Sequence, residues 1–110
     1  MSALFKMEYT GAQGFGAGAL YVGRGRIVGL DVLGGEYRGQ YTNIGRRLRG
    51  TVTLSSASNS LQLVTGQTLG PGQAVEIALD WPENLDTGTH KVTVSGAPVH
   101  VQLTKIDDIP

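Results

Sequence analysis

The sequence contains no cysteine and carries no net charge, and both absences narrow the range of functions. Without cysteine there is no disulfide framework, no thiolate nucleophile and no cysteine-based zinc or iron–sulfur site. Nine basic residues balance nine acidic ones, so bulk charge gives no argument for a nucleic-acid partner. No apolar run approaches the roughly 18 residues of a membrane span, and the amino terminus lacks an apolar signal-peptide core. We therefore expect a cytoplasmic protein with no nucleic-acid partner and no membrane association.

Segments that favour a helix are also missing. No ten-residue window holds a 3.6-residue apolar period free of glycine or β-branched interruption, and 17 of the 110 residues are glycine. A chain of this length is sufficient for one core that buries roughly two thirds of the unfolded surface. We expect a single all-β domain over residues 1–110.

Short alternating segments run along the whole chain. Residues 3–10 place Phe5, Met7 and Tyr9 on one face, which is the period of a half-buried strand. Similar patterns predict further strands over residues 47–55, 61–65, 75–81, 90–95 and 99–106. The residues expected to face inward are Leu48, Gly50, Val52 and Leu54 in the first of these and Val75, Ile77, Leu79 and Trp81 in the third. The whole pattern indicates an antiparallel meander of eight or nine strands. Closing the meander into a small barrel removes its exposed edges, so a barrel is favoured over a sandwich with the same meander.

The central stretch, residues 16–41, reads as three strands joined by two glycine turns. Arg24-Gly25 and Gly34-Gly35 supply the positive φ that primed two-residue hairpin turns require. The first turn pairs Val22 with Ile27. The second turn, read as a two-residue loop, pairs Val32 with Tyr37, Asp31 with Arg38 and Leu30 with Gly39. Asp31 and Arg38 are expected to form an exposed ion pair.

This register gives the stretch two apolar faces. One carries Ala19, Tyr21, Val28, Leu30, Val32, Tyr37 and Tyr41, and the opposite face carries Leu20, Val22 and Ile27. A strand pair that is apolar on both sides is covered by the core on one side and by something else on the other. We assign Leu20, Val22 and Ile27 to the outer face and predict an isologous homodimer through them. The alternative is that scattered surface aliphatics need no cover.

Arginines gather in loops that a meander places together. Alternate loops of a meander lie at the same end of a barrel, so the loops near residues 23–26, 42–47, 66–73 and 96–98 are expected to cluster. This arginine rim contains Arg24, Arg26, Arg46 and Arg47 and no acidic residue. The opposite end is expected to collect the acidic residues Glu36, Glu83, Asp86, Asp107 and Asp108. The arginine rim would suit a phosphate, a carboxylate ligand or an acidic partner surface, unless the arginines are simply solvated.

Candidates for catalysis and metal binding are weak. His90 has the parity of an inward side chain and His100 that of an outward one, so they do not form a metal pair. No Ser, His and acid triplet has local spacing, and we predict no catalytic residue, no metal and no cofactor. Aromatic residues are expected either to fill the barrel or to line a cavity for an apolar ligand: Tyr9, Tyr21, Tyr37, Tyr41 and Trp81.

The central stretch also resembles a known family. Gly18-Ala19-Leu20, Gly25 to Ile27, Gly29 to Asp31 and Tyr37 to Gly39 follow the G-x-L, G-x-I, G-x-D, Y-x-G order of the GrlR-like proteins, negative regulators of type III secretion genes. The closing residues 101–106 are similar to that family's carboxyl end. The resemblance implies a lipocalin-like or calycin-like small barrel, a homodimer and a role in binding.

One departure limits what the resemblance implies. The resembled regulators carry an acidic run in the loop after the Tyr-x-Gly strand, whereas residues 42–47 of this chain are Thr-Asn-Ile-Gly-Arg-Arg. The reversed charge means that neither the family's activator partner nor its secretion role carries over. We expect a non-enzymatic, homodimeric binding or regulatory module with a protein partner. The alternatives are a carrier of a small apolar or acidic ligand and a calycin-type enzyme.

Overall fold

The computed structural model describes residues 2–56 and 59–110 and is built from β-strands. Eight strands form one antiparallel sheet that is nearly closed into a barrel, as predicted, and a two-stranded hairpin stands apart from it. The sheet strands are β1 (Ser2–Gly11), β2 (Gly14–Gly23), β3 (Arg26–Asp31), β4 (Glu36–Ile44), β5 (Arg47–Ser55), β8 (Ala74–Pro82), β9 (His90–Val94) and β10 (Ala97–Asp108). The hairpin consists of β6 (Leu61–Gln62) and β7 (Thr68–Leu69).

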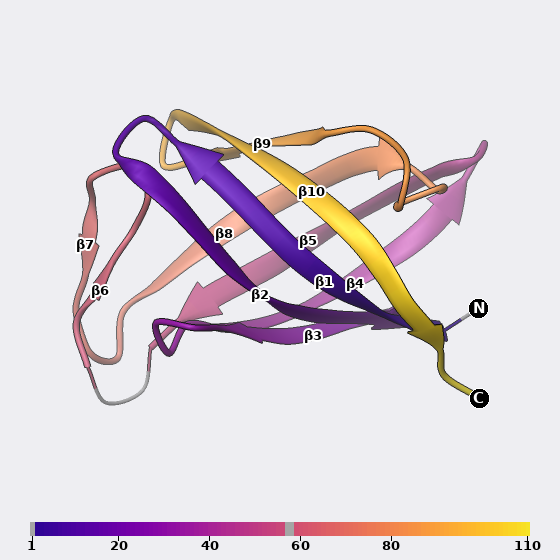
Figure 1. Cartoon of the computed structure of the whole chain (residues 1–110), viewed down its shortest axis with the longest axis horizontal. Helices are drawn as coiled ribbons and strands as arrows, with labels where there is room; N and C mark the ends of the chain where they lie inside the picture. The colour runs from indigo at the N-terminus through magenta and orange to yellow at the C-terminus, as the bar shows by residue number, and fades with distance from the viewer. Residues whose placement is uncertain (1, 57–58) are drawn as a thin grey trace.

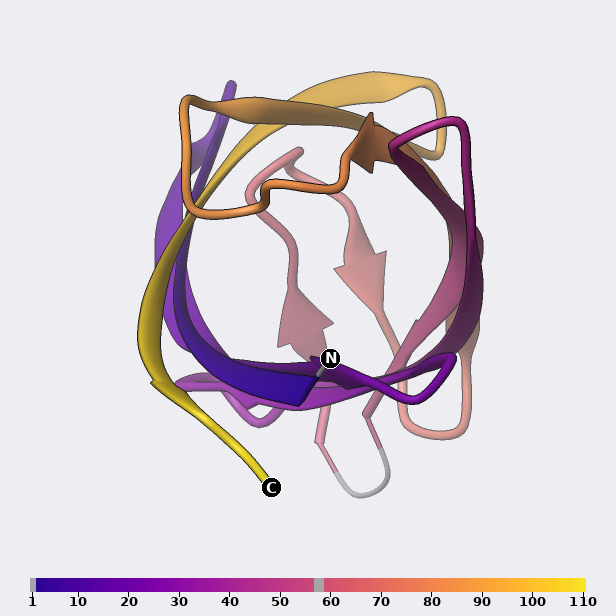
Figure 2. The same cartoon turned by 90° about the vertical axis from the view of Figure 1, so that its right-hand side faces the viewer.

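Neighbouring strands in the sheet follow the order β8-β5-β4-β3-β2-β1-β10-β9. The chain ends lie at one end of the barrel, and the hairpin β6–β7 lies at the other (Figure 1). We call these the terminal end and the hairpin end. Viewed from the terminal end, the strands form a ring with β6–β7 visible through it at the far side (Figure 2).

Alternation along the strands determines which side chains fill the ring. Along each strand, buried side chains alternate with side chains that face outward. The buried ones include Phe5 and Met7 of β1, Leu48 of β5 and Leu103 of β10. The inward faces predicted for β1, β5 and β8 are confirmed. Gly39 and Gly50 help the sheet to coil, because a Cβ at either position would collide with a backbone carbonyl of the neighbouring strand.

Of the two turns predicted within residues 16–41, the first has the predicted register and the second does not. Arg24 and Gly25 have φ values of 53° and 77° and form the predicted two-residue turn, which pairs Val22 with Ile27. After β3 the turn is longer than predicted, and Leu30 lies opposite Glu36 rather than Gly39. The predicted register of this second hairpin is therefore wrong by three residues.

The seam of the barrel lies between β8 and β9, the two ends of the strand order. Trp81 of β8 stacks on His90 of β9 with ring centroids 4.9 Å apart, and its indole Nε1 donates a hydrogen bond to the carbonyl of Lys91 at 3.2 Å. The Nε2 atom of His90 lies 2.7 Å from the carbonyl oxygen of Leu85. Side-chain packing thus closes the barrel where no strand ladder is recorded within the described residues.

Candidate functional site

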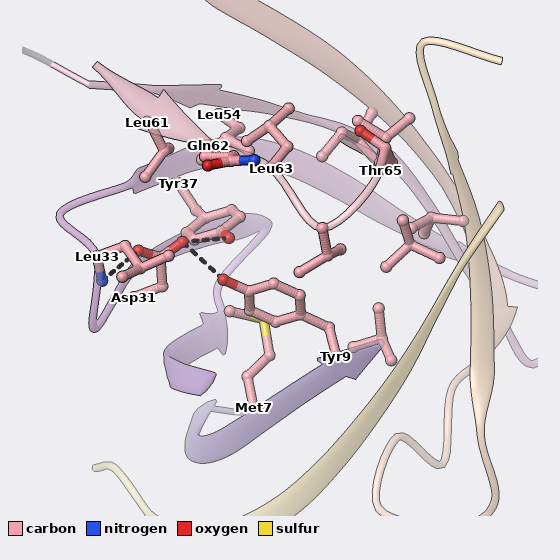
Figure 3. A pocket seen from close by; sticks show the side chains of 16 residues that line it. Met7, Tyr9, Asp31, Leu33, Tyr37, Leu54, Leu61, Gln62, Leu63 and Thr65 are labelled. Atoms are coloured by element: carbon pink, nitrogen blue, oxygen red, sulfur yellow. Dashed lines mark hydrogen bonds between the residues drawn. The ribbon is translucent and has the colours of Figure 1, made fainter. Parts of the chain in front are cut away.

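A small apolar cavity lies at the hairpin end, between the barrel wall and the β6–β7 hairpin (Figure 3). Its volume is about 70 Å³. Aliphatic side chains dominate its lining, and Asp31, Tyr9 and Tyr37 are grouped at one side of it. Pockets that hold drug-sized ligands have volumes of roughly 300–1,000 Å³, so this cavity is too small for a lipid or a comparable ligand.

Asp31 is a buried carboxylate whose oxygens are fully engaged. One oxygen, Oδ1, accepts hydrogen bonds from the backbone N–H groups of Leu33 at 3.0 Å and Gly35 at 2.9 Å. The other, Oδ2, accepts from the hydroxyls of Tyr37 at 2.8 Å and Tyr9 at 3.0 Å. The side chain therefore organises the turn after β3 and ties it to β1 and β4.

The two tyrosines are held as neutral donors. Burial, followed by the nearby Asp31 carboxylate, raises the pKa of Tyr9 to about 12. Burial also raises the pKa of Tyr37, and the charge fields of Tyr9 and Asp31 add to the shift. A phenol held neutral in this way donates a hydrogen bond and does not act as a base near neutral pH. The cluster therefore supports the structure of the turn and one wall of the cavity.

A second feature is an apolar surface on the outside of β2 and β3. Val28, Leu30 and Val32 are exposed, with Leu30 at 60% and Val32 at 74%. Ala19 lies opposite Leu30 and Tyr21 opposite Val28, and the N–H of Val32 donates to the carbonyl of Ala17 at 3.0 Å. We call this surface the outer apolar face: Ala17, Ala19, Tyr21, Val28, Leu30 and Val32.

The three residues predicted to form the dimer interface face the barrel interior instead of the outer surface. Leu20, Val22 and Ile27 are buried in the core of their own chain, with Val22 and Ile27 each 1% exposed. The prediction that they form an outer interface is therefore wrong. The error follows from the second hairpin, because a three-residue shift is odd and moves Tyr37 to the face of Leu20 and Ile27.

Of the four loops predicted to cluster around the arginine rim, only the two that carry the arginines lie together at the terminal end. Antiparallel pairing of β3, β4 and β5 places the turns at residues 24–25 and 45–46 together at the terminal end. The loops at 66–73 and 95–96 lie at the hairpin end, because β6–β7 does not continue the meander. Glu36 lies at the hairpin end as predicted, but Glu83, Asp107 and Asp108 lie at the terminal end with the arginine turns. The N–H of Glu83 donates to the carbonyl of Arg46 at 3.0 Å. The prediction of an acid-free end is therefore wrong.

The individual arginines have different surroundings. Arg24 belongs to the first turn and Arg46, with φ of 64°, to the turn after β4. Arg47 is held by Asp80, with 2.7 Å between Nε and Oδ1. Arg26 lies on β3, opposite Gln40 of β4. The four residues therefore do not converge on one site.

The aromatic residues mostly fill the interior. Tyr37 and Trp81 are buried, and Tyr9 and Tyr41 are partly buried against the core. Tyr21 instead lies on the outer face between Leu4 and Val28, and its hydroxyl donates to Oγ of Ser2 at 3.3 Å. The prediction of an interior position for Tyr21 is therefore wrong.

Asp31 is the site residue that sequence reasoning missed, because it was predicted to form an exposed ion pair with Arg38. Arg38 instead pairs with Glu36 at 2.9 Å. A local signal for the role of Asp31 exists, since aspartate before a glycine-containing turn commonly accepts backbone N–H bonds two residues on.

The described part of the chain contains neither a metal-ligand cluster nor a membrane-spanning helix. Within residues 2–56 and 59–110 there is no cluster of three or more metal-ligand side chains. The same residues contain no helix with the length and apolarity needed to cross a membrane. Comparison of the sequence with protein-family models and with curated proteins finds no match.

Proposed function

We propose that this protein is a non-enzymatic protein-binding module that works as a homodimer through its outer apolar face. The observation that carries the proposal is the exposure of Val28, Leu30 and Val32 side by side on one sheet surface. Contiguous exposed apolar surface on a soluble domain marks an interaction site. The resemblance to GrlR-like regulators supports a regulatory role, and the absence of cysteine suits the reducing cytoplasm.

The charges that flank the outer apolar face favour a second copy of the chain as its occupant. Across one row of the sheet the outward residues are Lys6 of β1, Ala19 of β2, Leu30 of β3 and Glu36 of β4. The apolar centre thus has a cation on one side and a carboxylate on the other. If two copies pack face to face about a two-fold axis parallel to the strands, each Lys6 lies opposite the Glu36 of the partner. The face is therefore complementary to itself.

The interior of the barrel gives less support to a ligand carrier or an enzyme. The cavity of about 70 Å³ is too small for a lipid-sized ligand unless β6–β7 moves aside. The buried titratable side chains are also occupied, since Asp31 accepts four hydrogen bonds and His90 packs against Trp81. These observations favour a binding surface on the outside of the barrel.

The first test is the mass of the protein in solution. Analytical ultracentrifugation of the wild-type chain is expected to show a dimer, and Leu30→Asp is expected to be monomeric because it places a charge at the centre of the apolar face. Ile44→Asp is the matched control, since Ile44 is 64% exposed at the far end of β4, and it is expected to remain dimeric. A monomeric wild type, or a dimer that survives Leu30→Asp, contradicts the proposal.

A charge swap tests the orientation of the dimer. Lys6→Glu and Glu36→Lys are each expected to weaken the dimer because like charges then face each other, and the double variant is expected to restore it. Native mass spectrometry distinguishes the carrier alternative. A dimer without added mass agrees with the proposal, whereas a monomer that retains a lipid-sized ligand supports a carrier.

A further inference from the structure

A polar groove lies on the outside of β3, β4 and β5, beside the outer apolar face. Its volume is about 660 Å³, and it is open to solvent along its length. Arg26, Arg38 and Arg49 line it together with Gln40, Thr42 and Thr51, and Glu76 is the only acidic residue among its lining. The groove therefore combines three guanidinium groups with hydroxyl and amide donors.

The strand register places the arginines around one point. Gln40 lies opposite both Arg26 and Thr51, Arg49 lies opposite Thr42, and Arg38 lies opposite Thr53. With strands about 4.8 Å apart and outward residues about 6.7 Å apart along each strand, the three arginine Cα atoms form a triangle with sides of about 8, 12 and 14 Å. The midpoint of its longest side lies over the Gln40–Thr51 pair.

That point is within reach of all three side chains. It is about 7 Å from each of the three Cα atoms on the same strand spacings. An extended arginine side chain carries its guanidinium about 6–7 Å from its Cα, given bond lengths near 1.5 Å. Arg26, Arg38 and Arg49 can therefore contact a single anionic group above Gln40 and Thr51.

The existing ion pairs leave the arginines available to a ligand. Arg38 contacts Glu36 at 2.9 Å, but the side chains are 63% and 42% exposed. Arg49 lies 3.5 Å from Asp80, whose closer partner is Arg47 at 2.7 Å. Within the described part of the chain, Arg26 has no recorded ion pair. Exposed pairs of this kind contribute at most about 1 kcal/mol, so an anion that engages several arginines at once can displace them.

We propose that this groove is a binding site for a dianionic phosphate group, with Arg26, Arg38 and Arg49 contacting the phosphate oxygens. The planar fork of arginine matches phosphate with two parallel hydrogen bonds, which a lysine cannot reproduce. The Thr51 hydroxyl and the Gln40 amide supply donors for the remaining oxygen. The three arginines come from β3, β4 and β5 of one chain, so the site needs no residue of a second copy.

The test is a titration of the full chain followed by backbone amide NMR. Glycerol 3-phosphate and inorganic phosphate are the two phosphate probes and citrate is the polycarboxylate control, each added at constant ionic strength against sodium chloride. Saturable shifts at Gln40, Thr42 and Thr51 are expected with both probes. Tighter binding of glycerol 3-phosphate would identify a ligand with an organic part, whereas equal binding would identify phosphate alone; either result supports the site.

Variants then separate the groove from general charge. Arg26→Gln with Arg38→Gln is expected to weaken binding at least about tenfold, because each charged hydrogen bond contributes substantially. Arg24→Gln with Arg46→Gln removes the same charge from turns outside the groove and is expected to change affinity less than about twofold. Arg26→Lys is expected to weaken binding although the charge is kept.

Three results would overturn the proposal. The first is the absence of saturable shifts with either probe. The second is equal weakening by the groove pair and the turn pair of variants, which would indicate attraction to net charge only. The third is tighter binding of citrate than of both phosphates, which would indicate a polycarboxylate ligand.

Discussion

Asp31 shows how one side chain can determine the path of the chain around it. Its carboxylate accepts two backbone N–H bonds from the turn after β3 and two phenol O–H bonds from Tyr9 and Tyr37. The donors come from the turn, from β1 and from β4. Four charge-assisted hydrogen bonds compensate for the cost of burying the charge, which is otherwise high.

Replacing Asp31 by asparagine is expected to destabilise the protein by about 1–3 kcal/mol. The asparagine amide offers one acceptor oxygen, and its NH₂ group would face N–H or O–H donors. Urea unfolding measures the change, and Asp107→Asn, an exposed carboxylate on β10, is the control with an expected change below about 0.5 kcal/mol. Equal unfolding midpoints for the two variants would argue against the role assigned to Asp31.

The neutral state of Tyr9 predicts a loss of stability in alkaline solution. The pKa of Tyr9 is raised from 10.0 to about 12 in the folded protein, so above pH 10 the unfolded chain releases this proton first. The contribution is fully present below pH 10 and is lost as the pH rises towards 12. Urea unfolding between pH 9 and pH 12 measures it. In Tyr9→Phe this part of the pH dependence should be smaller, and an unchanged slope would contradict the assignment.

At the scale of elements, the β6–β7 hairpin closes one end of the barrel instead of extending the sheet. Its Leu61 and Leu69 are each 3% exposed, although the hairpin strands are two residues long. Such a short strand pair has little stability of its own, so burial of these leucines against the barrel holds it in place. The hairpin also forms part of the cavity wall.

Leu61→Ala is expected to cost about 2–5 kcal/mol, because it removes a buried side chain and enlarges an existing cavity. Leu33→Ala is the matched control. Leu33 lines the same cavity from the β3–β4 turn but is 56% exposed, so its replacement is expected to cost less than about 1 kcal/mol. Chemical denaturation compares them, and similar costs would mean that the hairpin does not depend on this contact.

At the scale of the whole molecule, the barrel is least continuous between β8 and β9. Every other neighbouring pair in the strand order is joined by a ladder, whereas Trp81 connects these two through His90 and the Lys91 carbonyl. A seam that depends on side chains opens at lower free energy than a ladder of backbone hydrogen bonds.

Replacing Trp81 is expected to open this seam selectively. Trp81→Ala should cost about 3–5 kcal/mol, whereas Trp81→Phe keeps a ring against His90 and should cost less. Hydrogen exchange is expected to accelerate in β9 more than in β2 and β3 in the alanine variant. Uniform acceleration in all strands would instead indicate a loss of global stability without a local seam.

Local sequence patterns were sufficient for much of the fold. Alternation in residues 3–10 and 47–55 correctly predicted the buried faces of β1 and β5, and the Arg24-Gly25 turn correctly predicted the first hairpin. The sequence pattern places Asp31 on the surface opposite Arg38, because its hydrogen-bond partner Tyr9 lies 22 residues away in the sequence. A pattern within one strand contains no information about such a contact.

The sequence alone determined that the chain is all-β, which residues alternate and where the first hairpin turns, because these depend on period-two patterning and on backbone conformations available to glycine. Tertiary structure decided which side of β2 and β3 faces the core. The Asp31-centred turn sets the register of β4, and a shift by an odd number of residues exchanges the two faces. Tertiary structure also decided that β6–β7 lies outside the eight-stranded sheet. The loops at residues 66–73 and 95–96 therefore lie at the opposite end of the barrel from the one predicted.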